Sequence, residues 1–573
     1  MKKDLTIMIG GAAGQGLQVI GQVLSRALAR TGLHVFANQE YESRIRGGHS
    51  FFQIRASTTR VDAQHDTVDI LVALNEETIH LHEGQTAPHG LVMYDSDLIK
   101  TEYSGDQYLP LPLSTLSMEI AGSKRMANTV AVGAAWSAMG MDVRVVEGVL
   151  ETIFGRRGSD IVEKNVQVVR AGTKRGTKVR TEALALEAPG GPARLLLPGN
   201  EAVALGAIAA GCKFYSAYPM SPSTGVMEFL TAHGSEFGIV VEQAEDEIAA
   251  IHMAIGASFM GTRSMTGTSG GGFALMAEGL GLAGCAEIPL VIFEAQRPGP
   301  ATGMPTRTGQ GDLLFLTFAS QDEFPRVVLA PTTPESAFQL TVHAFNLADR
   351  HQTPVFVLSD HHLAASYWTV DALATEGVVV DRGELAAAED LASGADYLRY
   401  RFTPSGISPR AWPGQGRALV VSTGDEHDES GHISEEAKNR TQMVDKRWRK
   451  LEHLEAGPGL EADIQEDAAI VLLGWGSTYG AIREAAERLR AEGERISWVQ
   501  LHRLWPFPSE ELTGLLHGHE HVVVIENNSM GQMARLMRME TGIQATEQIH
   551  KYDGRPFSPQ DIVQHNVILK GFV

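Results

Sequence analysis

Four acidic residues stand within six positions at the start of an apolar stretch, VEQAEDEIAAIHMAIGAS, residues 241–258. A carboxyl group at the edge of an apolar helix loses contact with water, which raises its pKa and suits it to proton transfer. Helical spacing predicts one apolar stripe along this stretch. Its members are Val241, Ala244, Ile248, Ile251 and Ile255.

The predicted helix gives these acids unequal positions. At about 100° per residue, Asp246 points away from the stripe, where the helix dipole favours a solvated N-terminal acid. Glu245 and Glu247 border the stripe on opposite edges, and either one could project into a cleft. The pattern alone leaves both as candidates for a catalytic carboxyl.

Hydroxyl and glycine motifs follow two predicted strands nearby. AYPMSPSTG, residues 217–225, carries Ser221, Ser223 and Thr224 between prolines, which makes a stiff loop able to hydrogen-bond a carboxylate. Part of this loop also serves as the N-cap of the next predicted helix. In TGTSGGGFALM, Thr268 and Ser269 precede three glycines at a strand's carboxyl end, where open α/β sheets bind ligands. We therefore expect Thr268 and Ser269 to contact a cofactor, and close packing of the helix on the strand without a ligand is the alternative.

An arginine ends the apolar segment PLVIFEAQ, and a Gly/Pro-rich loop follows it. Arg297 beside hydroxyl donors suits a bidentate grip on a carboxylate. A salt bridge between Arg297 and Asp312 is the alternative. Thr306 and Arg307 lie in the same loop and could meet a second, distal carboxylate.

A second glycine motif, GGAAGQG at residues 10–16, lies between a strand and a helix near the N-terminus. Gly14 and Gly16 would let a phosphate approach backbone N–H groups at the helix start. The nearby RIRGGHS adds Arg44 and Arg46, which suit a polyanionic ligand. A tight turn without ligand is the alternative, and the G-x-x-G-x-G order differs from the dinucleotide pattern G-x-G-x-x-G.

The elements that must position these residues alternate between strand and helix, which predicts parallel sheets with helices on both faces. We expect an α/β domain at residues 1–175, a linker at 176–192 and a second α/β domain at 193–375. An irregular arm would follow at 376–465, and a final α/β domain at 466–573. At 573 residues the chain is too long for one core.

Composition narrows the class of protein. The net charge of −21 disfavours nucleic acid as a partner, because phosphate binding needs a basic face. With two cysteines and no CxxC or Cys/His cluster, we expect neither a zinc nor an iron–sulfur site in this chain. We expect no signal peptide and no membrane-spanning segment, and therefore a cytoplasmic enzyme.

Taken together, the motifs resemble a known family. AYPMSPST, EDEIAAIHMAIGAS, TSGGGFALM and FEAQRPGPATGMPTRTGQGD, in this order, resemble the α subunit of the 2-oxoacid:ferredoxin oxidoreductases. GGAAGQGLQ with RIRGGHS resembles the family's γ domain, fused at the N-terminus. YRFTPSGISPRAWPG and GDEHDESGHISEE are similar to the 2-oxoglutarate branch. The resemblance covers nearly the whole chain.

The resemblance implies a thiamine-diphosphate enzyme of transketolase-like architecture. Such an enzyme decarboxylates a 2-oxoacid, passes electrons through a [4Fe-4S] cluster to ferredoxin and makes an acyl-CoA, or runs in reverse to fix CO2. In the family pattern, the glutamate that hydrogen-bonds the aminopyrimidine ring falls at Glu247. Arg297 falls at the substrate-carboxylate arginine, and Ser221 falls where the family has threonine.

The resemblance also implies a partner. The GDG motif with a downstream NN, which holds magnesium in such enzymes, has no counterpart here, and cluster cysteines are missing too. A β subunit would then supply Mg²⁺, diphosphate binding and the iron–sulfur cluster in an (αβ)₂ heterotetramer, with thiamine diphosphate at the interface. The γ-like domain, with Gly14, Gly16, Arg44 and Arg46, would hold coenzyme A. The C-terminal domain would support assembly.

Three alternatives stay open at this point. A paralogue could act on pyruvate, branched-chain or aryl 2-oxoacids instead of 2-oxoglutarate. The chain could be a non-catalytic scaffold subunit. It could also be a stand-alone oxidoreductase that binds a dinucleotide at GGAAGQG.

Overall fold

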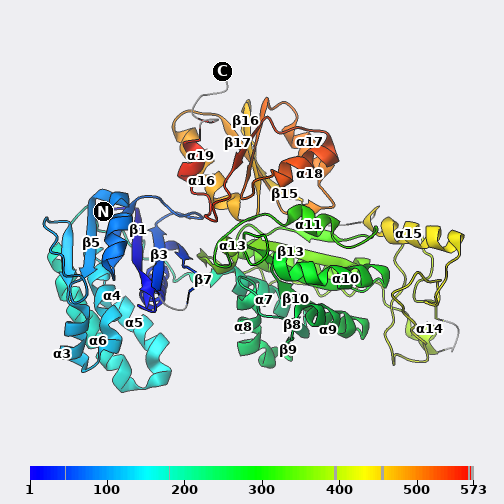
Figure 1. Cartoon of the computed structure of the whole chain (residues 1–573), viewed down its shortest axis with the longest axis horizontal. Helices are drawn as coiled ribbons and strands as arrows, with labels where there is room; N and C mark the ends of the chain where they lie inside the picture. Colours follow the sequence, from blue (N-terminus) through cyan, green and yellow to red (C-terminus); the bar gives the residue numbers. More distant parts are fainter. Residues whose placement is uncertain are drawn as a thin grey trace. The chain divides into compact units, whose positions relative to one another are not determined.

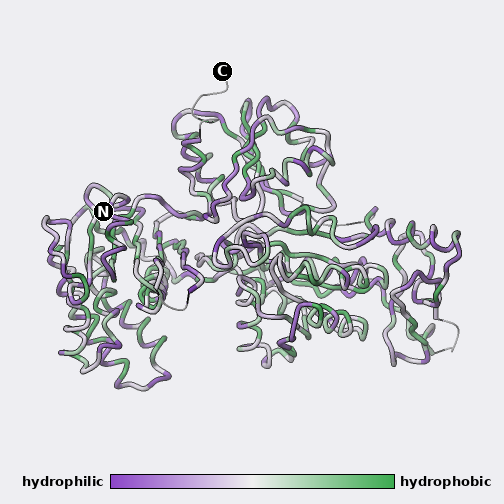
Figure 2. Tube along the Cα trace, viewed as in Figure 1, coloured by the Kyte–Doolittle hydropathy of each residue, from purple (hydrophilic) through white to green (hydrophobic). Residues whose placement is uncertain are grey.

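In the computed structural model the chain divides into two compact units, each with its own core (Figure 1). The first comprises Met1–Pro198, Ser366–Ala372 and Ser558–Gln564, and the second holds the other residues. The structure describes residues 1–573 except 45–46, 180, 393–396, 453, 455–456, 458, 566–567 and 569–573. In both units hydrophobic residues concentrate on the strands and the inward helix faces (Figure 2). Among the described residues, no helix is both long and apolar enough to cross a membrane.

An eight-stranded sheet forms the first unit, in the order β6-β5-β4-β1-β3-β2-β14-β7. β1, β4, β5 and β6 run parallel, as the alternating pattern predicts, but β3 is antiparallel to both β1 and β2. The difference arises because six residues, 41–46, join β2 to β3, and so short a connection suits an antiparallel pair but not a parallel crossover. The strands are β1 (Asp4–Ala13), β2 (His34–Glu40), β3 (Gly47–Ser57), β4 (Val68–Ala73), β5 (Thr86–Asp95), β6 (Tyr108–Leu111), β7 (Leu195–Pro198) and β14 (Tyr367–Val370).

Close helix packing stabilises this unit. A Cβ on Gly133 would stand 2.0 Å from the carbonyl oxygen of Val169, and one on Gly172 would stand 2.1 Å from that of Val130. The backbones of α4 and α6 therefore touch, which only glycine permits. Within the predicted linker, Leu186 is buried and bridges to Lys2. The helices are α1 (Leu17–Arg30), α2 (Glu76–His82), α3 (Leu113–Ala121), α4 (Ala127–Ala138), α5 (Val143–Phe154), α6 (Ser159–Gly176) and α19 (Pro559–Val563).

A seven-stranded sheet organises the second unit, in the order β18-β12-β13-β11-β10-β8-β9. All its pairs are parallel except β12 with β18, so the predicted doubly wound α/β class is confirmed. Successive residues of β11 belong to different hydrophobic clusters, as expected for a strand buried on both faces. Ile292 clusters with residues of α9, α10 and α11, and Phe293 clusters with residues of α7 and α12. The strands are β8 (Phe214–Ala217), β9 (Val240–Gln243), β10 (Ser264–Thr268), β11 (Leu290–Gln296), β12 (Val327–Leu329), β13 (Pro354–Asp360) and β18 (Arg503–Trp505).

Helices cover both faces of this sheet, so the carboxyl ends of its strands meet several helix starts. One residue separates β10 from α10, and three residues separate β9 from α9. The helices are α7 (Gly199–Ala209), α8 (Thr224–His233), α9 (Glu247–Phe259), α10 (Gly270–Cys285), α11 (Leu313–Phe318), α12 (Pro334–His351) and α13 (His361–Ala365).

The segment predicted as an irregular arm contains α14 (Ala388–Ala392) and the longer α15 (Ala437–Glu452). Buried ion pairs attach it to the unit's core. Lys446 and Lys450 of α15 both contact the buried carboxylate of Glu287, and Arg410 contacts that of Asp349. Buried charges need such partners, so these pairs fix where the arm lies.

A five-stranded sheet completes the second unit, in the order β15-β17-β16-β19-β20. β16, β17, β19 and β20 are parallel, as the alternating pattern of the final α/β domain predicts, and β15 is an antiparallel edge strand. The elements are β15 (Leu460–Asp463), β16 (Ile470–Trp475), α16 (Tyr479–Ala491), β17 (Ile496–Leu501), α17 (Ser509–Leu516), β19 (His521–Glu526), α18 (Gln532–Thr541) and β20 (Glu547–His550).

Candidate functional site

The acidic stretch at 242–247 places one carboxyl in the interior. α9 begins at Glu247, whose side chain is 3% exposed, whereas Glu245 is exposed. Asp246 is the N-cap residue, and its carboxylate accepts a hydrogen bond from the Ala249 N–H at 2.7 Å. The structure thus separates two carboxyls that helical spacing leaves equivalent. The catalytic role of Glu247 stays a prediction.

The predicted apolar stripe is wrong at two positions. Val241 lies in strand β9, before the helix starts, and Ile248 is 46% exposed. The buried face of α9 instead runs through Glu247, Ala250, Ile251, Ala254, Ile255 and Ser258. Because the helix begins at 247, Glu245 precedes it, and the face of α9 that packs into the core includes the Glu247 side chain.

The carboxyl group of Glu247 lies against the start of α10. A Cβ on Gly272 would stand 2.6 Å from its Oε1 and 2.2 Å from the Thr268 hydroxyl. Oε1 is buried and has no hydrogen-bond partner among the described residues, and the same holds for the Ser269 hydroxyl. An unpaired buried carboxylate oxygen is costly, so this position calls for a donor supplied by a ligand or water.

Arg297 follows β11 and lies beside the hydroxyl-bearing loop. Its Nη1 donates a hydrogen bond to the carbonyl oxygen of Ser221 at 2.7 Å. Burial lowers the pKa of Arg297, while the carboxylates of Asp312 and Glu247 favour its charged form. The structure therefore brings Arg297, Ser221 and Glu247 into one region, as the motifs predict, with the guanidinium facing the carboxyls.

The hydroxyls of the 217–225 loop have different surroundings. Ser221 is exposed and precedes a cis peptide bond to Pro222. Ser223 is buried and occupies the N-cap position of α8, yet its hydroxyl donates to the carbonyl oxygen of Met220 at 2.8 Å. Only the Ser221 side chain of these two is therefore open to an incoming ligand.

Thr306 and Arg307 lie farther along the loop that Arg297 starts. Thr306 is buried, and Arg307 lies close enough to lower the pKa of the buried His361 at the end of β13. The Cβ of Arg307 packs against Gly554, where an added Cβ would stand 3.1 Å away. Their contact with a distal carboxylate stays a prediction.

The C-terminal sheet holds this loop in place, a contact that the sequence does not reveal. The Gln310 backbone N–H donates to the Asn527 carbonyl oxygen at 2.8 Å, and the Asn527 backbone N–H donates to the Gln310 side-chain oxygen at 3.0 Å. The Gln310 side-chain amide also donates to the Trp475 carbonyl oxygen. Asn528 donates to the Gln310 carbonyl at 3.0 Å. The one available signal is the polar ENN sequence directly after an apolar strand.

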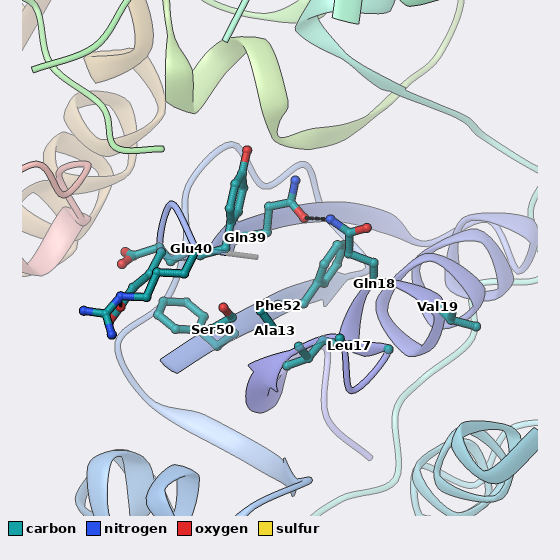
Figure 3. A pocket seen from close by; sticks show the side chains of 14 residues that line it. Ala13, Leu17, Gln18, Val19, Gln39, Glu40, Ser50 and Phe52 are labelled. Carbon is teal, nitrogen blue, oxygen red and sulfur yellow. Dashed lines mark hydrogen bonds and ion pairs between the residues drawn. The ribbon is translucent and has the colours of Figure 1, made fainter. Parts of the chain in front are cut away.

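The predicted glycine site of the first unit lines a pocket of about 320 Å³ (Figure 3). Gly14 and Gly16 both have positive φ, and Gly16 is the N-cap residue of α1. Arg44 also lines the pocket and pairs with Glu42 at 2.9 Å. Arg46 lies outside the described residues. Gln18 donates to Gln39 at 3.3 Å across this region (Figure 3).

The charge of this pocket differs from the predicted basic loop. Glu40 and Glu42 line it together with Arg44, so its described charged residues do not sum to a basic surface. Aromatic side chains of Tyr41 and Phe52 supply an apolar wall. A Cβ on Gly14 would meet nothing within 4 Å, which leaves its backbone accessible to a ligand.

Metal ligands are not gathered in the described part of either unit. No three His, Cys, Asp or Glu side chains there are grouped so as to hold a metal ion. Cys212 is buried, Cys285 is half-buried, and both are free thiols.

Comparison with known proteins places these sites in a family. Residues 205–446 match the thiamine-diphosphate-binding model of pyruvate flavodoxin/ferredoxin oxidoreductase. Residues 6–175 match the pyruvate ferredoxin/flavodoxin oxidoreductase model, and residues 468–562 match core domain II of pyruvate:ferredoxin oxidoreductase. Glu247, Ser221 and Arg297 all fall within the first match.

Relatives of nearly equal length share about a third of the sequence. The 2-oxoacid:ferredoxin oxidoreductase subunit alpha of Sulfolobus sp is 33% identical over 96% of this chain and 95% of its own. The 2-oxoglutarate oxidoreductase subunit KorA of Mycobacterium tuberculosis is 32% identical over 94% of this chain and 87% of its own. A solved 2-oxoglutarate:ferredoxin oxidoreductase from Magnetococcus marinus, with 2-oxoglutarate, coenzyme A and succinyl-CoA bound, has 33% identity. It superimposes with a TM-score of 0.90 over 98% of this chain and 99% of that one. The chain therefore belongs to the 2-oxoacid:ferredoxin oxidoreductase α-subunit family.

Proposed function

We propose that the chain is the α subunit of a 2-oxoglutarate:ferredoxin oxidoreductase that converts 2-oxoglutarate and coenzyme A to succinyl-CoA and CO2. The observation that carries this is the buried carboxyl of Glu247, whose Oε1 has no donor among the described residues. The bound 2-oxoglutarate, coenzyme A and succinyl-CoA of the Magnetococcus marinus structure support the substrate.

The residues present fit thiamine diphosphate. Glu247 offers a buried acceptor for a ring N–H, and Gly272, which has no side chain, lets that carboxyl lie close to the start of α10. When bound, thiamine diphosphate supplies the nucleophilic carbon and the electron sink that decarboxylation of a 2-oxoacid requires. Thr268 and Ser269 would line the same position from the end of β10.

Each residue has a defined task in this proposal. Glu247 holds a proton at the ring nitrogen in a low-dielectric interior, where its charge acts more strongly than in water. Arg297 anchors the substrate carboxylate that adjoins the oxo group, and Ser221 offers a hydroxyl beside it. Thr306 and Arg307 would bind the distal carboxylate.

A β subunit completes the site in this proposal. Large apolar side chains are exposed on α9, α10 and α11, at Ile248, Met253, Leu275, Phe315 and Phe318. Exposed apolar groups that gather on one set of elements mark a surface for a protein partner. We assign that surface to the β subunit, which would bring Mg²⁺, the [4Fe-4S] cluster and access to ferredoxin in an (αβ)₂ assembly.

Coenzyme A is assigned to the pocket of the first unit. Gly14 and Gly16 present backbone N–H groups at the start of α1, which suits a phosphate, and Arg44 lies beside them. The apolar wall formed by Tyr41 and Phe52 suits a ring or an alkyl chain.

The decisive experiment is reconstitution with the β subunit. The purified αβ complex should reduce ferredoxin, or a low-potential dye, only when 2-oxoglutarate and coenzyme A are both present. Glu247→Gln should lower kcat by at least about 10²-fold, the scale of a lost proton-transfer group. Glu245→Gln, on the exposed neighbour, is the matched control and should keep full activity.

Two outcomes would contradict the proposal. Equal activity of Glu247→Gln and Glu245→Gln would show that the chain is a scaffold without a catalytic carboxyl. A higher kcat/KM for pyruvate, branched-chain or aryl 2-oxoacids than for 2-oxoglutarate would assign the chain to a paralogous enzyme.

A further inference from the structure

A fully buried carboxyl group lies within an apolar strand near this site. Glu294 lies in β11, paired with Thr268 of β10 and Leu358 of β13, and its side chain has no exposed surface. Among the described residues no backbone N–H, hydroxyl, amide or cation donates a hydrogen bond to either of its carboxyl oxygens. Burial raises the pKa of Glu294 well above its usual range, because an ionised carboxylate without a partner is strongly disfavoured there.

Its neighbour is a second carboxyl. The side chain of Asp312, the residue before α11, lies within hydrogen-bonding reach of the Glu294 carboxyl, and the Asp312 backbone N–H donates to the Gln296 side-chain oxygen at 3.0 Å. A hydrogen bond between two carboxyl groups requires a proton on one of them. Burial raises the pKa of Asp312 to about 6, although the hydrogen bond from Glu294 and the charge of Arg297 act in the opposite direction.

The backbone of α10 makes room for this pair. A Cβ on Gly270 would stand 2.4 Å from Oδ2 of Asp312, so only glycine at this position lets the carboxyl approach. Thr268 pairs with Glu294 in the sheet register. Its hydroxyl and the carboxyl of Glu247 are the two groups closest to the position of a Cβ on Gly272. Glu247 and Thr268 therefore lie close to Gly272, and Asp312 lies close to Gly270, in the first turn of the same helix.

The charged groups around the pair come from several elements. Arg297, after β11, favours the ionised form of Asp312, and Glu247 of α9 faces the same guanidinium. Asp360, at the end of β13, disfavours ionisation of Glu294. The pair therefore has one cation and two further carboxyls as neighbours.

We propose that Glu294 and Asp312 share one proton and that a substrate carboxylate bound at Arg297 draws a second proton from solvent onto Asp312. The bound carboxylate cancels the positive charge that keeps Asp312 ionised. Asp312 then becomes a neutral acid, Glu294 keeps its proton, and Asp312 no longer competes with the substrate for the guanidinium. Asp312 is thus a positioning residue, and the second half of the inference rests on the proposed substrate site at Arg297.

Infrared spectroscopy of the full chain tests the shared proton without any substrate. At pH 7 the wild type should show a carboxylic-acid C=O band that Glu294→Gln removes, with the circular dichroism spectrum unchanged. Glu278→Gln, which changes an exposed carboxyl, is the control and should leave the band intact. If the wild type and Glu294→Gln show the same spectrum, there is no shared proton.

Calorimetry of the αβ complex tests the second proton. Titration with 2-oxoglutarate at pH 7, in buffers of different ionisation enthalpy, should show uptake of about 0.4 proton for a rise of about one pKa unit at Asp312. Asp312→Asn should bind 2-oxoglutarate with no such uptake. Equal proton uptake by the two proteins would overturn the coupling. Absence of 2-oxoglutarate binding in the wild type would instead reject the proposed substrate, and the infrared result would still decide the pair.

Discussion

Replacing Gly272 by alanine tests whether the position of the Glu247 carboxyl matters for the reaction. Gly272 lies in the first turn of α10 with ordinary helical backbone angles, so alanine is tolerated by the backbone itself. An added Cβ would stand 2.6 Å from Oε1 of Glu247 and 2.2 Å from the hydroxyl of Thr268. Both atoms belong to side chains, which can move while the backbone stays in place.

The expected effect follows from these distances. Restoring ordinary contact distances of about 3.5 Å moves the Glu247 carboxyl by about 1 Å. A displacement of about 1 Å at a reacting group costs roughly 10²-fold in rate, or about 2.7 kcal/mol of barrier. The fold should change little, because alanine is favoured over glycine in a helix by about 1 kcal/mol, which offsets the repacking.

The assay compares two neighbouring glycines in the reconstituted αβ complex. Gly271→Ala is the matched control, since its Cβ would have the Ala301 carbonyl oxygen as its nearest neighbour, at 3.5 Å. We expect kcat/KM for 2-oxoglutarate to fall about 10²-fold in Gly272→Ala and less than about twofold in Gly271→Ala, with similar Tm values. Equal kcat/KM in both variants would refute the argument, as would a large fall in Tm confined to Gly272→Ala.

Three further predictions concern the loop after β11 and the buried histidines. Arg307→Ala should raise KM for 2-oxoglutarate about tenfold or more while leaving KM for pyruvate unchanged, because pyruvate has no distal carboxylate; an unchanged KM for both would remove Arg307 from the substrate site. Gln310→Ala should raise KM for every 2-oxoacid and also lower Tm, since it frees the loop from Asn527 and leaves the buried Trp475 carbonyl without its amide donor; KM values equal to those of the wild type would show that the loop needs no such support. Burial lowers the pKa of His361 to about 4 and that of His362 to about 3, so the unfolded state binds more protons below pH 6.5 and stability falls as the pH drops from 6.5 toward 4. The loss for His361 is at most about 3 kcal/mol, and His361→Gln should flatten the pH dependence of urea unfolding between pH 7 and 5; an unchanged slope would contradict this account.

Local patterns predicted much of the fold because they depend on near neighbours in the chain. The apolar segments 5–10, 289–296 and 354–360 are strands, and the stretch 17–30 is a helix closed by a positive-φ glycine at position 32. Glycines that follow an apolar strand correctly indicated where α1 and α10 begin. The antiparallel β3 was not predictable in this way, because strand direction depends on which distant strands pair.

The individual residues of the candidate site could be predicted from the sequence, but the contacts that hold them in place could not. Motif order identified Glu247 and Arg297, whereas helical spacing left Glu245 and Glu247 equivalent because the helix start was placed too early. Contacts between Gln310 and Asn527 join residues 217 positions apart, which no local pattern reveals. Glu294 did carry a signal, as the one charged residue inside the strand LVIFEAQ.

Charge balance explains why these carboxyls are buried beside an arginine meant for an anion. Asp312 and Glu247 act on the guanidinium of Arg297, while Glu294 is coupled to Asp312 and Asp360. Four ionised carboxylates in this region would repel an incoming substrate carboxylate. Burial raises the pKa values of Glu294, Asp312 and Asp360, so protons neutralise part of this charge near neutral pH. Gly270 and Gly272 make that burial possible, since a side chain at either position would push a carboxyl away. The glycine motif after β10 therefore sets the electrostatics of the site as well as its shape.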